Sequence, residues 1–549
     1  MGNCINLSLS KKMEQPLPVE ADFKLPAPLP SWPPGGEFAK GRIDLGGLEV
    51  CQVSTFEQVW VTREGGEDGL GAAFFKPSPI PDGFSALGYY AQPNNRPLFG
   101  WVLAGRPTDD DGASLAKPVD YSLVWSSESS SVKQDVHGYF WLPTPPEGYR
   151  AVGLVVTTSP EKPALDEVRC VRSDLTDEAE NDANIWSTDG FSVDVSRPVS
   201  RGINASGVMA GTFSAQATGA ASASTLACLK NTASNLTSMP NLAQVDALMS
   251  AYSPWIYFHP DEEYLPSSVS WFFDNGALLY QKGNQIPTPI DSNGGNLPQG
   301  GSNDGEYWID LAAEDGQKEK LKKGDISVTK LYLHIKPMLG ATFTDVAIWL
   351  FYPFNGPARA KVSFVNLKLG KIGQHVGDWE HVTLRISNFT GELWKVYFAE
   401  HSGGTWVDAS QLEFQEGNNK PVGYASLHGH AMYAKPGMVL QGNTKLGIGI
   451  RNDTATGQGI DSGKSFEVVA AEYLGAAAGT EPPWLNYMRE WGPKIKYDIA
   501  KELKSVEKWL PGKMKSAFES VIEGLPDEVL GEEGPTGPKD KNSWQNDEK

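Results

Sequence analysis

The stretch GQHVGDWEHVTLRISNF, residues 373–389, sets two histidines, an aspartate and a glutamate around a tryptophan and continues as an alternating run. Alternation with a period of two is typical of a β-strand, whose successive side chains point to opposite faces. On such a strand Asp378 and Glu380 share one face. Trp379 and His381 share the other. The stretch therefore predicts a strand that packs through its tryptophan and carries two carboxylates on its opposite side.

Similar segments surround this strand and indicate that its whole domain is built from β-strands. They are rich in β-branched and aromatic residues, and Gly, Pro and Asn clusters separate them. They are VTKLYLHIKP (328–337), DVAIWLFYPF (345–354), LWKVYFAEH (393–401), PVGYASLHG (421–429) and SFEVVAAEYL (465–474). We expect a β-sandwich-like domain over residues 241–480.

An internal repeat precedes this domain. FEQVWVTREGGEDGLGAAFFKPSPIPDGFSALGYYA (56–91) aligns without a gap to YSLVWSSESSSVKQDVHGYFWLPTPPEGYRAVGLVV (121–156), at an offset of 65 residues. Matched pairs are Trp60/Trp125, Phe75/Phe140, Pro81/Pro146, Gly83/Gly148, Phe84/Tyr149 and Gly88/Gly153. A weaker third copy starts at Ile185-Trp186 and closes at Gly211-Thr212-Phe213. Repeated strand and turn units predict a mainly β, threefold, β-prism-like domain over 45–215.

The remaining chain divides by composition. Residues 1–44 predict an anchor and a Pro-rich arm, and residues 216–240 a small-residue linker. Helical periodicity predicts C-terminal helices over 481–525 that pack on the β-sandwich. The charged, Gly- and Pro-rich residues 526–549 predict a disordered tail.

Charge and cysteine content exclude several classes of protein. The net charge is −20 and we identify no local basic patch, so we expect no nucleic acid as a partner, and charge alone disfavours an acidic membrane. The four cysteines show no CxxC spacing, which fits a reducing compartment better than a disulfide framework. No apolar run is long enough to span a bilayer.

The N-terminus MGNC resembles a lipidation signal. Gly2 is placed for N-myristoylation and Cys4 for palmitoylation, although Asn6 stands where Ser or Thr is usual. A second acyl chain makes membrane attachment firm. We expect a cytoplasmic protein held peripherally on the plasma membrane or on an endosomal or vacuolar membrane; an unmodified, irregular terminus is the alternative.

The carboxylates of the opening strand are candidate metal ligands. Asp378 and Glu380 repel each other on one face unless a cation lies between them. Mg²⁺ or Ca²⁺ would relieve that repulsion, with His375 as a further ligand. A solvated polar face is the alternative. The later pair His428-Gly429-His430 is interpreted as close backbone packing, with a zinc pair as the alternative.

Several long motifs resemble the plant branch of the vacuolar protein sorting-associated protein 62 family: HVGDWEHVTLRI, FAEHSGG, GHAMY, EPPWLNYMREWGPKI and HPDEEYLPS. The resemblance covers nearly the whole chain and implies a role in protein transport to the vacuole, with partners in the trafficking machinery. The Pro-Pro-x-Gly-aromatic turn of the repeat resembles the multivesicular-body-associated β-prism, which is linked to membrane trafficking.

The segment His375-x-x-Asp378-Trp379-Glu380 is similar to the GHRHDWE heptapeptide of necrosis- and ethylene-inducing-like proteins. That resemblance implies a divalent cation held in a β-sandwich by His375, Asp378 and Glu380. Asn355 stands roughly where that family has an aspartate, and His401 is a further candidate ligand. The implied use of the cation is contact with lipid headgroups.

Two functions follow from the same cluster, and a third reading needs no metal. The first is a non-catalytic, peripheral trafficking protein whose cation contacts a headgroup or glycan. The second is a metal-dependent hydrolase, with His381, His401 or Glu400 as base. We favour the first because no nucleophile elbow, P-loop or dinucleotide fingerprint is present. The third is a metal-free structural or interaction protein.

Overall fold

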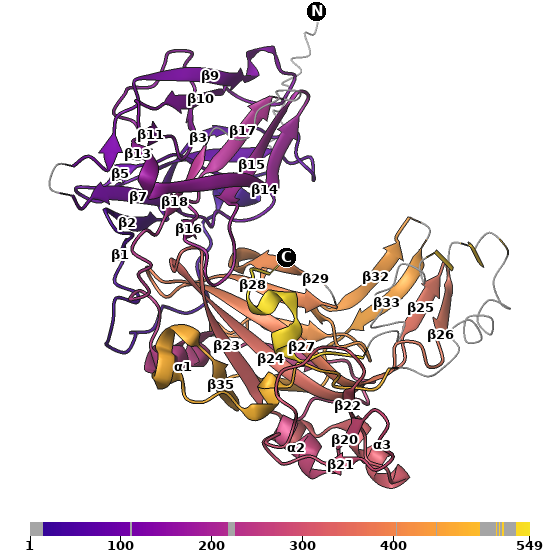
Figure 1. Cartoon of the computed structure of the whole chain (residues 1–549). Helices are drawn as coiled ribbons and strands as arrows, with labels where there is room; N and C mark the ends of the chain where they lie inside the picture. The colour runs from indigo at the N-terminus through magenta and orange to yellow at the C-terminus, as the bar shows by residue number, and fades with distance from the viewer. Residues whose placement is uncertain are drawn as a thin grey trace, which may run out of the picture. The chain divides into compact units, whose positions relative to one another are not determined.

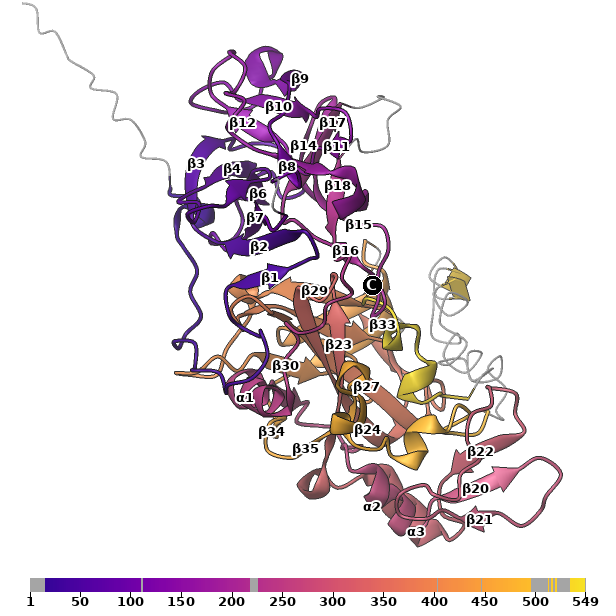
Figure 2. The ribbon, with the colours of Figure 1, turned by 60° about the vertical axis from the view of Figure 1, so that its left-hand side comes forward.

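The structure, a computed structural model, describes residues 15–109, 112–217, 226–401, 403–445, 447–494 and 534–548, together with Gly512, Lys515, Ser516, Glu519 and Ser520. The chain forms two compact units and is mainly β, which confirms the predicted fold class (Figures 1 and 2). Unit 1 comprises Met1–Lys24, Gly47–Val199 and Met209–Leu229, and unit 2 comprises Leu25–Gly46, Ser200–Val208 and Lys230–Lys549.

Unit 1 is built from three principal antiparallel arrays of strands. They are β3-β4-β6 (Phe56–Val61, Ala72–Pro77, Tyr90–Pro93), β12-β10-β9 (Val155–Thr157, Tyr139–Thr144, Asp120–Ser126) and β18-β14-β15-β17 (Ala227–Lys230, Thr176–Thr188, Phe191–Pro198, Phe213–Ala217). Shorter strands form β2-β7-β5 (Leu48–Val53, Val102–Pro107, Ser85–Ala86) and β11-β13-β8 (Tyr149–Arg150, Cys170–Arg172, Leu115–Ala116). Strand β18 lies inside the predicted linker 216–240, of which residues 218–225 are outside the described part of the chain.

The tryptophans of the three repeat copies meet in the core of unit 1. The rings of Trp60, Trp125 and Trp186 lie 5.7 to 6.2 Å apart, centroid to centroid. Where the copies close, a Cβ on Gly88 would lie 2.7 Å from Gly153 Cα and 2.8 Å from Thr212 Cγ2. The two glycines of the repeat are therefore matched because a side chain would not fit between them.

The gapless alignment of the repeat is wrong at one position. Strand pairing places Phe74 opposite Trp60, as it places Phe140 opposite Trp125, so Phe74 rather than Phe75 is the counterpart of Phe140. Both copies have the same shift in register beside their tryptophan, so the second copy has one additional residue between its two paired strands. The offset of 65 returns at Pro81/Pro146.

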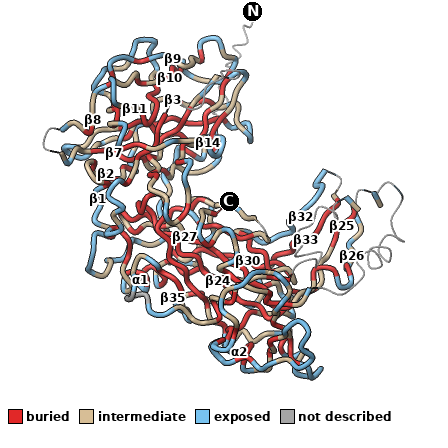
Figure 3. Tube along the Cα trace, in the orientation of Figure 1, coloured by how far each residue is buried: buried red, intermediate tan, exposed pale blue. Residues whose placement is uncertain are grey.

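Unit 2 is centred on a six-stranded sheet in the order β29-β28-β27-β24-β23-β35. Its strands are Gly403–Asp408, Leu393–Glu400, His375–Ser387, Phe343–Asn355, Leu331–Met338 and Phe466–Ala470, and the strand predicted within residues 373–389 is confirmed as β27. Every residue of β24 is buried, and Figure 3 shows β24 and β27 in the buried interior.

The two faces of this sheet carry separate apolar clusters. One face packs against α1 (Leu242–Tyr252) and the sheet β31-β30-β19-β34 (Met432–Tyr433, Val422–Ala425, Trp255–Phe258, Gly459–Asp461). The other packs against α2 (Val269–Asp274) and the sheet β21-β20-β22 (Thr288–Pro289, Leu278–Gln281, Tyr307–Asp310). The sheet is thus a layer covered on both sides, so polar groups on either face leave water.

The other elements of unit 2 are peripheral to this sheet. They are β1 (Arg42–Asp44), β16 (Gly207–Val208), α3 (Asp315–Lys323) and the sheet β26-β25-β33-β32 (Val365–Lys368, Arg359–Val362, Ile448–Thr454, Gly437–Asn443). Among the described residues, no helix has the length and apolar character needed to cross a membrane.

The C-terminal region departs from both predictions made for it. Residues 483–486 form a single 3-10 turn rather than the start of an α-helix, because Trp484 and Trp491 pack against Trp379. Most of the predicted helices lies outside the described residues. Residues 534–548, predicted to be disordered, instead lie on the central sheet with Trp544 2% exposed.

Replacing Gly153 by alanine should destabilise unit 1 by about 1–3 kcal/mol, because the new methyl group would overlap Thr212 and Gly88. Gly403→Ala is the control, since a Cβ there has nothing within 4 Å. Denaturant unfolding followed by circular dichroism measures both. Equal stability of the two variants would contradict the packing described.

Candidate functional site

One cavity of about 390 Å³ in unit 2 collects all five predicted metal-site residues: Asn355, His375, Asp378, Glu380 and His401. The antiparallel register of β24 and β27 explains part of this grouping, because it sets Asn355 opposite His375 and Tyr352 opposite Asp378. The remaining walls come from the sheet β25-β33-β32 and from the segment 534–548.

The carboxylates of β27 are not a solvated face. Asp378 is 7% exposed and Glu380 is 5% exposed. Trp379 packs among the aromatic rings of the opposite face, so the predicted alternation holds. A buried ionised group is costly unless it is paired and hydrogen-bonded. The polar groups of this strand therefore need partners from other segments.

The partner of Asp378 is His430, 52 residues away along the chain, a pairing that no sequence motif indicates. His430 Nδ1 lies 2.8 Å from Asp378 Oδ2, and its ring stacks on Tyr352 at 3.8 Å. The other ring nitrogen lies 3.0 Å from the carbonyl oxygen of Tyr264. A carbonyl only accepts, so Nε2 donates to it, and Nδ1 faces the Asp378 carboxylate.

Burial alone would raise the pKa of Asp378, yet its pKa is lowered overall. The hydrogen bond from His430 and the nearby His375 and Lys541 outweigh the effect of burial. The same buried acids act in the opposite direction on Tyr352, whose pKa burial and Asp378 raise well above its usual value. The site thus holds an ionised carboxylate beside a neutral phenol.

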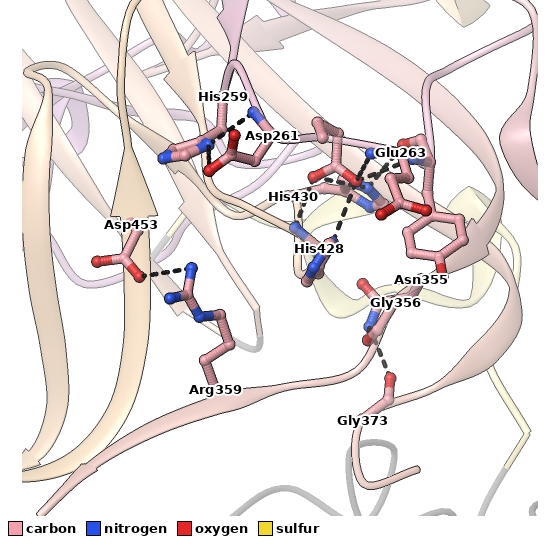
Figure 4. Close-up of polar contacts among 12 residues, drawn as sticks. His259, Asp261, Glu263, Asn355, Gly356, Arg359, Gly373, His428, His430 and Asp453 are labelled. Atoms are coloured by element: carbon pink, nitrogen blue, oxygen red, sulfur yellow. Dashed lines mark hydrogen bonds and ion pairs between the residues drawn. The ribbon is translucent and has the colours of Figure 1, made fainter. Parts of the chain in front are cut away.

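A second buried carboxylate, Glu262, closes the histidine side of the site. Its Oε2 accepts a 2.5 Å hydrogen bond from the backbone N–H of His428, and it lies 3.9 Å from His430 Nε2. Burial would raise the pKa of Glu262, but hydrogen bonds from His428 and the charge of His430 lower it. Figure 4 shows both histidines close to the turn that carries Asp261 and Glu263.

Three histidines around the cavity adopt backbone angles that favour glycine. The φ angles of His401, His428 and His430 are 58°, 71° and 55°. Non-glycine residues in this region cost free energy and cluster at functional sites. In the segment His428-Gly429-His430, these backbone angles and the hydrogen bond to the buried Glu262 bring His430 next to Asp378.

The remaining predicted ligands differ in how they are held. The side-chain amide of Asn355 donates to the carbonyl oxygens of Gly373 (2.6 Å) and Gly356 (3.1 Å), as Figure 4 shows for Gly373. His401 Nε2 lies 3.3 Å from Asn452 Oδ1. His375 Nδ1 is buried and has no hydrogen-bond partner in the described structure.

These side chains fit a divalent cation only in part. Among the residues that the structure describes, no three His, Cys, Asp or Glu side chains are arranged to hold a metal ion. Asp378 is already hydrogen-bonded to His430, and the amide of Asn355 is bound to backbone. Both nitrogens of His430 are engaged, so it does not form the alternative zinc pair with His428.

The candidate general bases have separate hydrogen-bond partners. His381 Nε2 lies 3.1 Å from Glu548 Oε1, and its ring stacks on Trp349 at 4.2 Å. Glu400 accepts a 2.9 Å hydrogen bond from the Thr405 hydroxyl. Of these residues, His381 and His401 line the cavity.

The segment 534–548 forms the wall of the cavity on the tryptophan face of β27. Glu548 Oε1 accepts hydrogen bonds from Thr383 (3.1 Å) and Lys336 (3.4 Å) in addition to its contact with His381. Burial would raise the pKa of Glu548, but these positive groups and hydrogen bonds lower it to about 2.

This segment makes a second buried contact of the same kind. Arg385, bound to Asp345 through two 2.8 Å hydrogen bonds, also binds Asp547 at 2.5 Å. Composition gave no signal for either contact, because it shows only that the tail is charged and rich in Gly and Pro.

A mainly β protein with a buried histidine and carboxylate cavity in its larger unit is the class that the fold and site define. The family described as vacuolar protein sorting-associated protein 62 matches residues 19–548, so the chain belongs to that family, as its sequence motifs predict.

A curated relative is the vacuolar protein sorting-associated protein 62 of Saccharomyces cerevisiae, 23% identical over 282 residues. The alignment covers 44% of this chain and 58% of the yeast protein, so somewhat more than half of that relative's length is matched.

Several solved structures show low similarity to this chain. GNIP1Aa from Chromobacterium piscinae is 19% identical with a TM-score of 0.26, covering 37% of this chain and 40% of its own. NLPPya in complex with mannosamine is 14% identical with a TM-score of 0.20, covering 34% and 67%. Necrosis and Ethylene inducing Protein 2, from the causal agent of cocoa's Witches Broom disease, is 14% identical with a TM-score of 0.17, covering 49% and 98%. TM-scores this low support no inference about function.

Glu548→Gln should lower the free energy of unfolding at pH 7 by roughly 3 kcal/mol, because the folded pKa lies about 2.5 units below the usual value. A depressed pKa stabilises the fold above the unfolded pKa of about 4.5 and ceases to do so as pH falls to about 2. The deficit of the variant should therefore shrink over that interval. Urea unfolding at several pH values measures it.

Glu481→Gln is the matched control, since Glu481 pairs with Lys539 but is 32% exposed. Its loss should be below about 1 kcal/mol. A Glu548→Gln deficit that is equally small, or one that persists unchanged to pH 2, would contradict the role assigned to Glu548.

Proposed function

We propose that this chain is a non-catalytic, peripheral membrane protein of vacuolar sorting whose cavity binds a polar ligand, such as a lipid headgroup or glycan. The observation that carries the proposal is the convergence of Asn355, His375, Asp378, Glu380 and His401 on one cavity. Family membership supports the sorting role at the coarser level.

The chemistry of the cavity suits a hydroxylated or cationic ligand. Asp378 supplies a buried acceptor whose lowered pKa keeps it ionised at neutral pH. His375 supplies a ring nitrogen that lacks a partner, and Trp379 an indole N–H in the same condition within the described structure. Small-molecule binding sites typically combine aromatic walls with a few polar groups that point into the same space, and this cavity has both.

A divalent cation is the second ligand that we propose for this cavity. The observation in its favour is the unpartnered His375 Nδ1 beside the ionised Asp378, a nitrogen and an oxygen donor lining one space. Mg²⁺ or Ca²⁺ would add positive charge between Asp378 and Glu380 and relieve their repulsion. Since no ready three-residue set is present among the described residues, a ligand oxygen would have to complete the coordination.

Membrane attachment in this proposal begins at the N-terminus. Acyl chains on Gly2 and Cys4 would hold the protein on the cytoplasmic side of a plasma, endosomal or vacuolar membrane. Both residues fall in 1–14, outside the described residues. Loss of labelled myristate in Gly2→Ala would support this part of the proposal independently of the cavity.

Titrating the purified protein with Ca²⁺ or Mg²⁺, with and without soluble lipid headgroups, should raise its melting temperature by several degrees, because a ligand of the native state stabilises it by mass action. Asp378→Asn and His375→Ala should each lose most of that shift. Asp461→Asn should keep it, since Asp461 is a partly buried carboxylate bound to Lys420 away from the cavity.

No shift in the parent protein with any headgroup or cation would refute the ligand-binding role. Turnover of a phosphodiester or ester panel that requires the metal and is lost in Asp378→Asn would replace it with the hydrolase alternative.

A further inference from the structure

The sheet β26-β25-β33-β32 carries a charge opposite to that of the chain. Residues 359–371 and 435–454 contain seven lysines or arginines and a single acidic residue, Asp453, whereas the whole chain has a net charge of −20. Figure 1 shows these four strands standing away from β24 and β27 within unit 2. No basic patch is evident in the sequence, because the lysines of this sheet lie in two segments that only strand pairing brings together.

The strand register gathers several of these basic groups. Lys368 of β26 pairs with Arg359 of β25, and Lys361 lies two residues further along the same strand face. Pairing of Ala360 with Ile450 brings the neighbouring Arg451 beside Arg359. The two arginines share Asp453, at 3.6 and 2.7 Å. One carboxylate therefore serves two guanidinium groups.

The lysines have no such counterions. Lysines 361, 368, 371, 435 and 445 form no ion pair with any residue that the structure describes. Four of them are exposed, and Lys361 is half-buried. Unbalanced lysines on a strongly acidic protein indicate attraction to an anionic surface rather than a contribution to stability.

Large apolar side chains accompany these lysines. Phe364, on the turn between β25 and β26, is 85% exposed. The backbone N–H of Ser363 donates to Gly447 O at 2.8 Å, which fixes this turn beside the turn that carries Lys445. Along the edge strand β32, Met438 is 42% exposed and Val439 is 39% exposed. Exposed phenylalanine costs hydration free energy that an apolar layer would recover.

We propose that this sheet is a membrane-contact surface for anionic phospholipids, with Phe364 entering the interface and the lysines reaching headgroup phosphates. Charge complementarity favours an anionic surface, and the aliphatic Met438 and Val439 favour lipid over nucleic acid, since they cannot stack on bases. The proposal rests on the proposed membrane role but uses surface residues rather than the interior of the ligand cavity.

Vesicle flotation with bacterially produced, unacylated protein isolates this contact from the N-terminal lipid. The parent should bind phosphatidylserine-containing vesicles and leave pure phosphatidylcholine vesicles unbound, with binding lost at high salt. Phe364→Ser should weaken binding roughly tenfold or more. The triple change Lys361→Glu, Lys368→Glu and Lys371→Glu should weaken it by roughly 100-fold.

Matched controls come from the same unit. Ile286→Ser removes an apolar side chain that is 77% exposed, and Lys323→Glu reverses an exposed lysine on α3, so both should bind as the parent does. Unchanged melting temperatures show that the sheet variants fold.

Three results would overturn the proposal: equal binding to neutral and anionic vesicles, full binding by Phe364→Ser, or the sheet variants losing RNA binding or self-association while vesicle binding persists. The cavity variant His375→Ala should still float with anionic vesicles. Failure of the cation and headgroup titration with intact, Phe364-dependent flotation would therefore remove the ligand-binding role and leave this contact standing. The reverse pattern would remove the contact alone.

Discussion

Unit 2 depends on one constraint: strand β27 lies in the middle of a sheet that is covered on both faces, yet it carries ionisable groups toward each of them. Asp378 leaves water on one side, and His381 and Arg385 leave it on the other. Every one of these groups must be paired, because an isolated buried charge is far costlier than a hydrogen bond can repay. The partners come from segments remote in sequence, and those segments are thereby fixed on the sheet.

On the face that carries Asp378, this pairing fixes the loop His428-Gly429-His430. The loop accepts left-handed backbone angles at His428 and His430 because the ring of His430 is stacked on Tyr352, bonded to Asp378 and bonded to the carbonyl of Tyr264. Local strain is retained where the surroundings over-determine it. The same arrangement leaves His375 Nδ1 without a hydrogen-bond partner among the described residues, next to an ionised acid, and this contrast distinguishes a candidate ligand position from a structural one.

Structural features that depend on a few neighbouring residues were predicted correctly from the sequence. Strand β27 and its two faces, the other central strands and the mainly β class all follow from alternation and composition. A short motif pointed to residues 375–380, whereas the pairing of β24 with β27 that sets Asn355 opposite His375 is seen only in the structure. Where two chemical reasons give the same pattern, prediction failed: the spacing of Trp484 and Trp491 fits a helix, but these rings pack on Trp379 without one.

Contacts that join distant segments were not predictable from composition. The hydrogen bond between His430 and Asp378 joins residues 52 positions apart. It depends on backbone angles that no sequence pattern predicts. A charged, Gly- and Pro-rich tail has the composition of a disordered segment, and its order comes from buried counterions on the sheet. The basic sheet was hidden for the same reason, since its lysines become neighbours only after strands 359–368 and 437–454 pair.

The distance along the chain between Glu548 and its counterions has a consequence for biosynthesis. Lys336 is 212 residues from Glu548, and Thr383 is 165. During translation at roughly 5–20 residues per second, the sheet emerges at least several seconds before the carboxylate that neutralises it. Nascent unit 2 therefore lacks the carboxylate partner of Lys336 until residue 548 has been made.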